Sequence, residues 1–183
     1  VTSLEIDPVV VKASKAYFGY KKREIDELVI RDARVFIKRA IKKGLSFDWV
    51  ILDAFSGDSI PEHLTTIEFY REIHQLLSPG GLVIANSAKF GLYSDSELLT
   101  FSKVFPGLHL YNAPRDGNRV IFGCKCDSFF SYQAPDKISN RLEELFSLSM
   151  DDLLSFINSK PRLNEKAMVL TDQRSPANLL IKN

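Results

Sequence analysis

The sequence is poor in several features that mark particular classes of protein. Only two of its 183 residues are cysteines, and its formal net charge at pH 7 is +1. Such a small net charge gives no electrostatic reason to expect binding to nucleic acid or to an anionic membrane. No apolar run reaches the length of a membrane-spanning helix, and no secretory signal opens the chain. We therefore expect a cytoplasmic protein that binds neither nucleic acid nor a membrane.

Cysteine and histidine predict little chemistry here. A single residue separates Cys124 from Cys126 at the end of an expected strand, and no disulfide is expected between them. Their spacing is also too short for a CxxC redox motif. The histidines, His63, His74 and His109, have no cysteine or acid at metal-ligand spacing. The sequence therefore predicts no metal site.

The remaining sequence alternates short apolar runs with amphipathic segments. The expected strands are 1–6, 28–30, 47–52, 82–85, 108–111 and 119–125, and the expected helices are 8–18, 33–43, 65–77, 94–105, 135–148 and 149–158. This order predicts a doubly wound, Rossmann-like α/β sheet that ends in an antiparallel hairpin. We expect a nucleoside-binding domain over residues 1–130, with the helices and tail of 131–183 packed on it.

Polar residues mark the expected helix starts. Asp7 precedes a proline and Asp32 precedes an amphipathic segment, and each fits an N-cap. Two capping boxes are expected, one between Thr65 and Glu68 and the other from 94 to 97. Phe69 and Tyr70 are interpreted as core or near-site packing. In the hairpin loop, charged side chains are expected to be solvated: Arg115, Asp116 and Arg119.

An acidic loop follows the most apolar strand. Residues 47–52 show no polar alternation, which is typical of a parallel strand covered on both faces. Asp53 comes directly after it, and Asp58 lies five residues further on. Because open α/β sheets bind ligands at the carboxyl ends of their strands, this loop is the first candidate for a functional site.

Several motifs occur together in a recognisable order. They are LEIDP at 4–8, RDAR at 31–34, FDWVILDAF at 47–55, LLSPGGLVIAN at 76–86 and LTDQRSP at 170–176. In these motifs the chain resembles the spermidine synthase (polyamine aminopropyltransferase) family, within the class I S-adenosylmethionine-dependent methyltransferases. The resemblance implies a role in polyamine biosynthesis, with S-adenosylmethionine or its decarboxylated form as co-substrate and no metal.

The resemblance also implies roles for individual residues. Glu5 would accept hydrogen bonds from the two ribose hydroxyls of the nucleoside, since a carboxylate offers two acceptor oxygens. Asp32 and Ala33 would contact the adenine, and Asp53 would hold the attacking amine, with Asp58 as a further substrate contact. Other interpretations stay open. Glu5 also fits a strand-end acid beside a helix dipole, Asp32 an N-cap, and Asp53 an acid that opens a turn.

The sequence departs from the family pattern in two places. Family members carry two acids as D-S-x-D, whereas here the second acid, Asp58, comes later. The family's glycine-rich loop and its amino-terminal hairpin would precede Val1. The strand before that loop would lie between the strands at 1–6 and 47–52, so the two halves of the sheet are expected to lack a common central strand.

Three functions remain open on the sequence. The first is transfer of an aminopropyl group from decarboxylated S-adenosylmethionine to a small amine. The second is methyl transfer from S-adenosylmethionine itself. The third is a truncated or degenerate domain that serves as a binding or dimerisation module. We also expect a homodimer.

Overall fold

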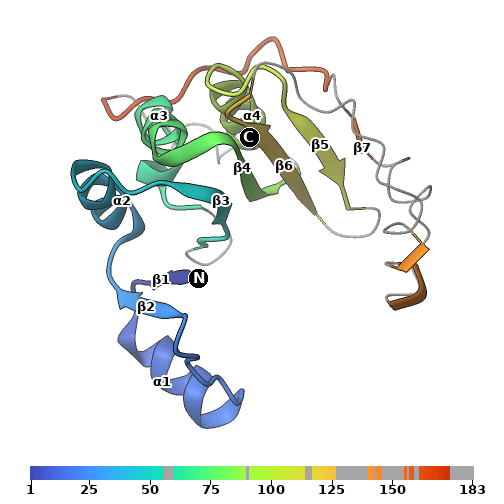
Figure 1. Cartoon of the computed structure of the whole chain (residues 1–183). Coiled ribbons are helices and arrows are strands. Elements are labelled where there is room, and N and C mark those ends of the chain that lie inside the picture. The colour runs from blue at the N-terminus through green and yellow to red at the C-terminus, as the bar shows by residue number, and fades with distance from the viewer. Residues whose placement is uncertain are drawn as a thin grey trace. The chain divides into compact units, whose positions relative to one another are not determined.

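The computed structural model describes residues 1–55, 60–89, 91–113, 117–126, 140–141, 143–145, 155, 157–158 and 161–173. The chain divides into two compact units, Val1–Ser46 and Phe47–Asn183 (Figure 1). Within the described part of the chain, no helix has the length and apolar character needed to cross a membrane.

The first unit contains one parallel strand pair and two helices. β1 (Thr2–Glu5) pairs with β2 (Glu27–Ile30), and α1 (Pro8–Tyr17) makes the crossover that parallel strands require (Figure 1). The Asp7 carboxylate accepts a hydrogen bond from the Val9 amide at 2.7 Å, which confirms the predicted N-cap. After α1, Gly19 adopts a φ of 68°, a left-handed conformation that suits a residue without Cβ.

The helix α2 (Ala33–Lys42) also begins where the sequence predicts. Asp32 caps it, and one carboxylate oxygen accepts from the Val35 amide at 2.9 Å. The buried positions are Arg34, Ile37 and Ala40. Their spacing of three residues keeps them on one face of the helix, so the amphipathic pattern determines which face is covered.

The second unit is built on a mixed sheet of five strands. These are β3 (Phe47–Leu52), β4 (Leu77–Ala88), β5 (His109–Asn112), β6 (Asn118–Cys124) and β7 (Ile157–Asn158). Their order in the sheet is β3-β4-β6-β5-β7, where β3 and β4 are parallel and the other pairs are antiparallel. The predicted α/β class and the hairpin of β5 and β6 are thus confirmed.

A cluster of aromatic rings forms the core beside this sheet. The rings of Tyr70 and Phe101 meet edge to face with centroids 5.0 Å apart, and those of Phe101 and Phe105 are 4.8 Å apart. Phe69 and Tyr70 are both buried, which confirms their predicted place in the core. A Cβ built on Gly123 of β6 would come within 2.7 Å of Phe105, so glycine lets these rings lie against the strand.

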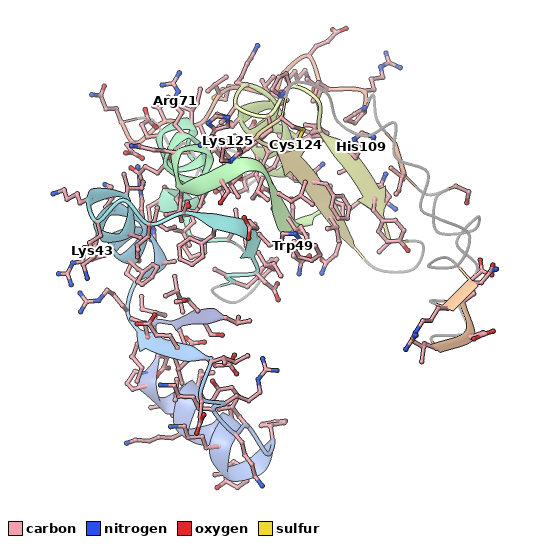
Figure 2. The ribbon with its side chains drawn as sticks, viewed as in Figure 1. Lys43, Trp49, Arg71, His109, Cys124 and Lys125 are labelled. Atoms are coloured by element: carbon pink, nitrogen blue, oxygen red, sulfur yellow. A yellow bond between two sulfur atoms is a disulfide. The ribbon has the colours of Figure 1, made fainter. Side chains whose placement is uncertain are left out.

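One face of β3 is uncovered, contrary to the prediction of a strand buried on both faces. Trp49 and Ile51 are 64% and 65% exposed (Figure 2). They lie two residues apart and therefore on the same face of the strand. Among the described residues, β3 pairs with β4 alone and β1 with β2 alone. An apolar run in the sequence therefore does not by itself ensure that both faces of a strand are covered.

The start of α3 (Ile67–Leu76) differs from the predicted capping box. Its N-cap is Thr66 rather than Thr65, and the Thr66 hydroxyl accepts from the Phe69 amide at 3.3 Å. Glu68 accepts a hydrogen bond from the backbone amide of Asp172 at 3.0 Å instead of closing a box. Thr66 itself donates to the Asp172 carboxylate at 2.7 Å. A segment distant in sequence has replaced the local partner.

The second capping box is also wrong. α4 (Leu92–Ser102) begins two residues before Ser94, and Gly91 at its N-cap makes no side-chain cap. Ser94 and Glu97 therefore lie inside the helix, where both are buried. A polar pair that resembles a helix start on sequence alone belongs here to the interior of the fold.

The segment 161–173 is attached to α3 and α4 by backbone hydrogen bonds (Figure 1). The Leu170 amide donates to the Thr100 hydroxyl at 2.9 Å, and the Leu170 carbonyl accepts from the Ile67 amide at 2.9 Å. The Leu170 side chain is fully buried. Most of the two helices predicted for 135–158 lies outside the described residues, and the prediction is wrong at Ile157–Asn158, which forms β7.

The prediction that the cysteines stay unbridged is wrong as well. Cys124 and Cys126 form a disulfide, and their Cα atoms are 5.3 Å apart (Figure 2). The strand β6 ends at Cys124. Side chains two residues apart on a strand share a face, so the two cysteines start on the same side of the chain, and the turn after the strand end brings their sulfur atoms together.

Candidate functional site

Asp53 lies at the carboxyl end of β3 and is held from the neighbouring strand. The Asn86 side-chain amide donates to one Asp53 oxygen at 2.9 Å. In the parallel register Leu52 is opposite Ala85, so Asp53 and Asn86 are the next residues on their two strands. Adjacent parallel strands thus place an acid and an amide at the same edge of the sheet, where open α/β sheets bind ligands.

This arrangement leaves Asp53 able to bind a cation. A carboxylate offers about four lone-pair sites, and the bond from Asn86 uses one of them. Asp53 is exposed, as a group that meets a ligand from solvent must be. The bond from Asn86 also favours one orientation of the carboxylate.

Two further predicted acids, Glu5 and Asp32, lie at the carboxyl ends of the adjacent strands β1 and β2 in the first unit. Glu5 is the last residue of β1, and its carboxylate accepts from the Asp7 amide at 2.9 Å. The Arg31 amide donates to the Glu5 carbonyl at 2.9 Å, so the ends of β1 and β2 are joined. Asp32 follows Arg31 directly, and Ala33 opens α2. The structure therefore brings Glu5, Asp32 and Ala33 to one edge of this strand pair.

Each of these two acids has a local structural role. The Glu5 carboxylate accepts from the Asp7 amide and the Asp32 carboxylate accepts from the Val35 amide. The N-cap interpretation of Asp32 is thus confirmed as a structural role. Asp58, the fifth predicted site residue, lies outside the described residues.

Sequence reasoning missed Asn86. It directly follows the apolar run of β4, at the same level as Asp53. The signal that could have found it is a polar residue at the end of a strand next in sequence to the one that carries the acid.

Sequence reasoning also missed a buried polar network in the second unit. Glu97 accepts from the Tyr70 hydroxyl at 3.2 Å and from the Ser87 hydroxyl at 2.5 Å. The Arg119 guanidinium donates to the Ser87 oxygen at 3.3 Å and to the Ser94 carbonyl. The expectation of a solvated Arg119 is therefore wrong, because its position on β6 directs it into the interior, where it is 3% exposed.

Burial sets the electrostatics of this network. It raises the pKa of Glu97, while the hydrogen bond from Ser87 and the charge of Arg119 act in the opposite direction. Burial likewise lowers the pKa of Arg119 and raises that of Tyr70 well above its usual value. Among the described residues, no group of three or more histidines, cysteines and acids could hold a metal ion.

Both the fold and the sequence of this chain are similar to those of known proteins. The fold is shared with a solved probable spermidine synthase from Corynebacterium glutamicum, with a TM-score of 0.60 and 26% identity over 78% of this chain and 53% of that one. The class is therefore a Rossmann-like α/β domain of the methyltransferase type. Residues 1–106 match the model of the spermine/spermidine synthase domain. The chain belongs to the spermine/spermidine synthase family.

Two curated relatives show different named activities. The polyamine aminopropyltransferase of Vibrio vulnificus is 38% identical over 181 residues, which are 97% of this chain and 60% of the relative. The N-terminal histidine N-methyltransferase of Emericella nidulans is 34% identical over 135 residues, 68% of this chain and 24% of the relative. The chain thus spans less than two thirds of the length of either protein.

Proposed function

We propose that this chain is part of an enzyme that transfers an aminopropyl group from decarboxylated S-adenosylmethionine to a small amine. The observation that carries the proposal is the Asp53 carboxylate, held by Asn86 at the carboxyl end of β3 in a chain of this family. Identity to a polyamine aminopropyltransferase over nearly the whole chain supports the same reaction.

In this proposal the residues of the first unit hold the nucleoside. Glu5 binds the ribose hydroxyls, Asp32 accepts from the exocyclic amine of adenine, and Ala33 leaves room for the ring. The donor supplies a sulfonium centre, whose neighbouring methylene carbon is open to attack. Because two carboxylates follow adjacent parallel strands, the residues present fit a ligand that carries a vicinal diol and an amine.

Asp53 acts on the acceptor. The amine nitrogen forms a bond to the methylene carbon as the bond from that carbon to sulfur breaks. The nucleoside leaves as a neutral thioether, and the new ammonium gives up a proton to water. Asp53 orients the amine and receives a hydrogen bond from the nitrogen as positive charge develops there. Its effect in this proposal comes from positioning the amine. We assign Asp58 a second contact with the acceptor.

Methyl transfer is the second candidate. The identity of 34% to an N-terminal histidine N-methyltransferase favours it. The same acids would then hold S-adenosylmethionine, and Asp53 would orient the amine that receives the methyl group. The two reactions differ in which carbon on sulfur is attacked, so the products distinguish them directly.

The test uses Asp53→Asn, with the chain joined to any residues that its gene encodes before Val1. We expect turnover of decarboxylated S-adenosylmethionine with a diamine to fall about a hundredfold. The matched control is Asp48→Asn, which changes an exposed acid on the same strand, away from its carboxyl end. Unchanged turnover in Asp53→Asn would remove Asp53 from the mechanism. Methylated products made from S-adenosylmethionine alone would favour the second candidate.

We further propose a cytoplasmic homodimer in which 131–183 packs on the nucleoside-binding domain of 1–130. The attachment of 161–173 to α3 and α4 supports that packing. Light scattering on the purified protein measures the oligomeric state, and a mass equal to one chain would contradict the dimer.

A further inference from the structure

The buried network in the second unit lies directly behind the residue that holds Asp53. We infer that Ser87, Glu97 and Arg119 are positioning residues, which fix the end of β4 so that Asn86 presents its amide to Asp53. This inference rests on the proposed role of Asp53 in holding the acceptor. It adds three residues to the site that do not themselves contact a substrate.

The geometry of β4 connects the two sets of residues. Asn86 and Ser87 are consecutive, and successive side chains of a strand point to opposite faces. Asn86 is half-buried and reaches Asp53, whereas Ser87 is fully buried and reaches Glu97. A shift or rotation of the backbone at Ser87 would therefore move the Asn86 amide by a similar amount.

Ser87 is the point where the network holds the strand. Its hydroxyl lies 2.5 Å from the Glu97 carboxylate and 3.2 Å from the Ala88 carbonyl, with the shorter bond to Glu97, and its oxygen accepts from the Arg119 guanidinium. Arg119 is also the register partner of Ser87 across the β4–β6 pair. Backbone pairing and side-chain bonding thus secure the same residue.

The remaining contacts of the network reach two helices. Glu97 belongs to α4 and also accepts from Tyr70 of α3, and Arg119 donates to the Ser94 carbonyl in α4. The side chains of Tyr70, Ser87, Glu97 and Arg119 are each at most 3% exposed. Four elements are therefore fixed to one another at the end of β4 by directional bonds.

Energetics favour a positioning role over a purely stabilising one. Removing charged groups from water is costly, and well-packed apolar residues in their place are often as stable or more so. Apolar packing does not give a hydroxyl, or the strand that carries it, a single defined orientation. A site that needs Asn86 at 2.9 Å from Asp53 has a use for such an orientation.

The test compares Ser87→Ala and Glu97→Gln with Thr100→Val. Thr100 lies on α4 close to Glu97, is fully buried and bonds to Leu170, so its loss perturbs the same helix without touching β4. Thermal melts establish that each variant folds. Two variants are used because Glu97→Gln leaves Arg119 with a neutral partner, whereas Ser87→Ala removes only one hydroxyl.

The first measurement is the side-chain amide signal of Asn86 in nitrogen-edited NMR spectra of this chain, assigned with an Asn86→Asp variant. We expect Ser87→Ala and Glu97→Gln to shift this signal and to raise its hydrogen-exchange rate about tenfold, the scale of one lost hydrogen bond. Thr100→Val should leave it in place. An unchanged Asn86 signal in both network variants would overturn the inference.

The second measurement separates kcat from KM in the chain joined to any residues that its gene encodes before Val1. Misplacement of a group that orients the acceptor should lower kcat about tenfold while KM for the nucleoside donor stays unchanged. If Thr100→Val lowers kcat as much as Ser87→Ala and Glu97→Gln do, at equal thermal stability, the role of the network is merely structural and the inference is overturned. If the unmutated protein transfers neither an aminopropyl nor a methyl group, the proposed function fails, and the Asn86 signal still decides the inference.

Discussion

At the scale of single residues, each acid of the candidate site takes part in a local structure. Glu5 and Asp32 accept hydrogen bonds from backbone amides near them in sequence, and Asp53 accepts from Asn86. A carboxylate has more acceptor positions than one hydrogen bond uses, so a structural bond is compatible with the ligand-binding roles that we propose. The presence of a cap is therefore no evidence against binding.

The buried Glu97 should make stability depend on pH. Burial raises its pKa above the ordinary value of 4.5, so the folded state holds the proton more tightly than the unfolded state. As pH rises from 4.5 through the pKa of the folded state, the unfolded state ionises first, and the free energy of unfolding falls. The group contributes its full stabilisation only below this window.

The measurement compares urea unfolding of the unmutated chain and Glu97→Gln at a series of pH values. The free energy of unfolding of the unmutated chain, minus that of the variant, should decrease as pH rises above 4.5 and then level off. Gln does not titrate, which makes the variant the reference for all other groups. A difference that grows with pH would show that bonds from Ser87 and Arg119 outweigh desolvation.

At the scale of secondary-structure elements, strand β6 packs closely against aromatic rings at the end of α4. Gly123 of β6 lies against the rings of Phe101 and Phe105, where an added Cβ would approach ring carbons at 2.9 and 2.7 Å. We expect Gly123→Ala to cost about 1–3 kcal/mol of stability through overpacking. Gly117→Ala is the matched control, because a Cβ there would meet nothing within 4 Å. Equal melting temperatures for the two variants would contradict this account.

The attachment of the tail gives the next prediction. Leu170 is fully buried, and its backbone bonds to Ile67 and Thr100. We expect Leu170→Ala to lower the free energy of unfolding by about 2–5 kcal/mol, as a buried leucine commonly does. Met168→Ala is the control, since Met168 is 45% exposed in the same segment. Urea titration measures the free energy of unfolding of both variants. If Leu170→Ala lowers it less than Met168→Ala does, the tail adds little to the stability of the fold.

At the scale of the whole molecule, the pairing of the strands affects how well we expect the chain to bind the S-adenosyl donor. Among the described residues no strand pair joins β1–β2 to the sheet of β3, and the residues proposed for the nucleoside and for the acceptor are divided between the two units. We expect this 183-residue chain by itself to bind S-adenosyl compounds poorly. Micromolar binding of S-adenosylmethionine in calorimetry of this chain alone would refute the expectation.

Local patterns in the sequence were enough to predict the order of α-helices and strands from β1 to β6, the caps at Asp7 and Asp32, and the placement of Asp53 at a strand end. These features follow from hydrophobic periodicity and from bonds between residues only two or three positions apart. The same local reasoning failed at Ser94 and Glu97, because a polar pair in a helix start and one in a buried network look alike along the chain.

Only the tertiary structure decided which polar residues meet. Asn86 and Asp53 are 33 residues apart, and Thr66 and Asp172 are 106 apart. Such pairs depend on the register of strands and on the docking of the tail, which periodicity does not encode. The burial of Arg119 was settled in the same way, because it depends on the helices that cover its strand as well as on its own neighbours in sequence.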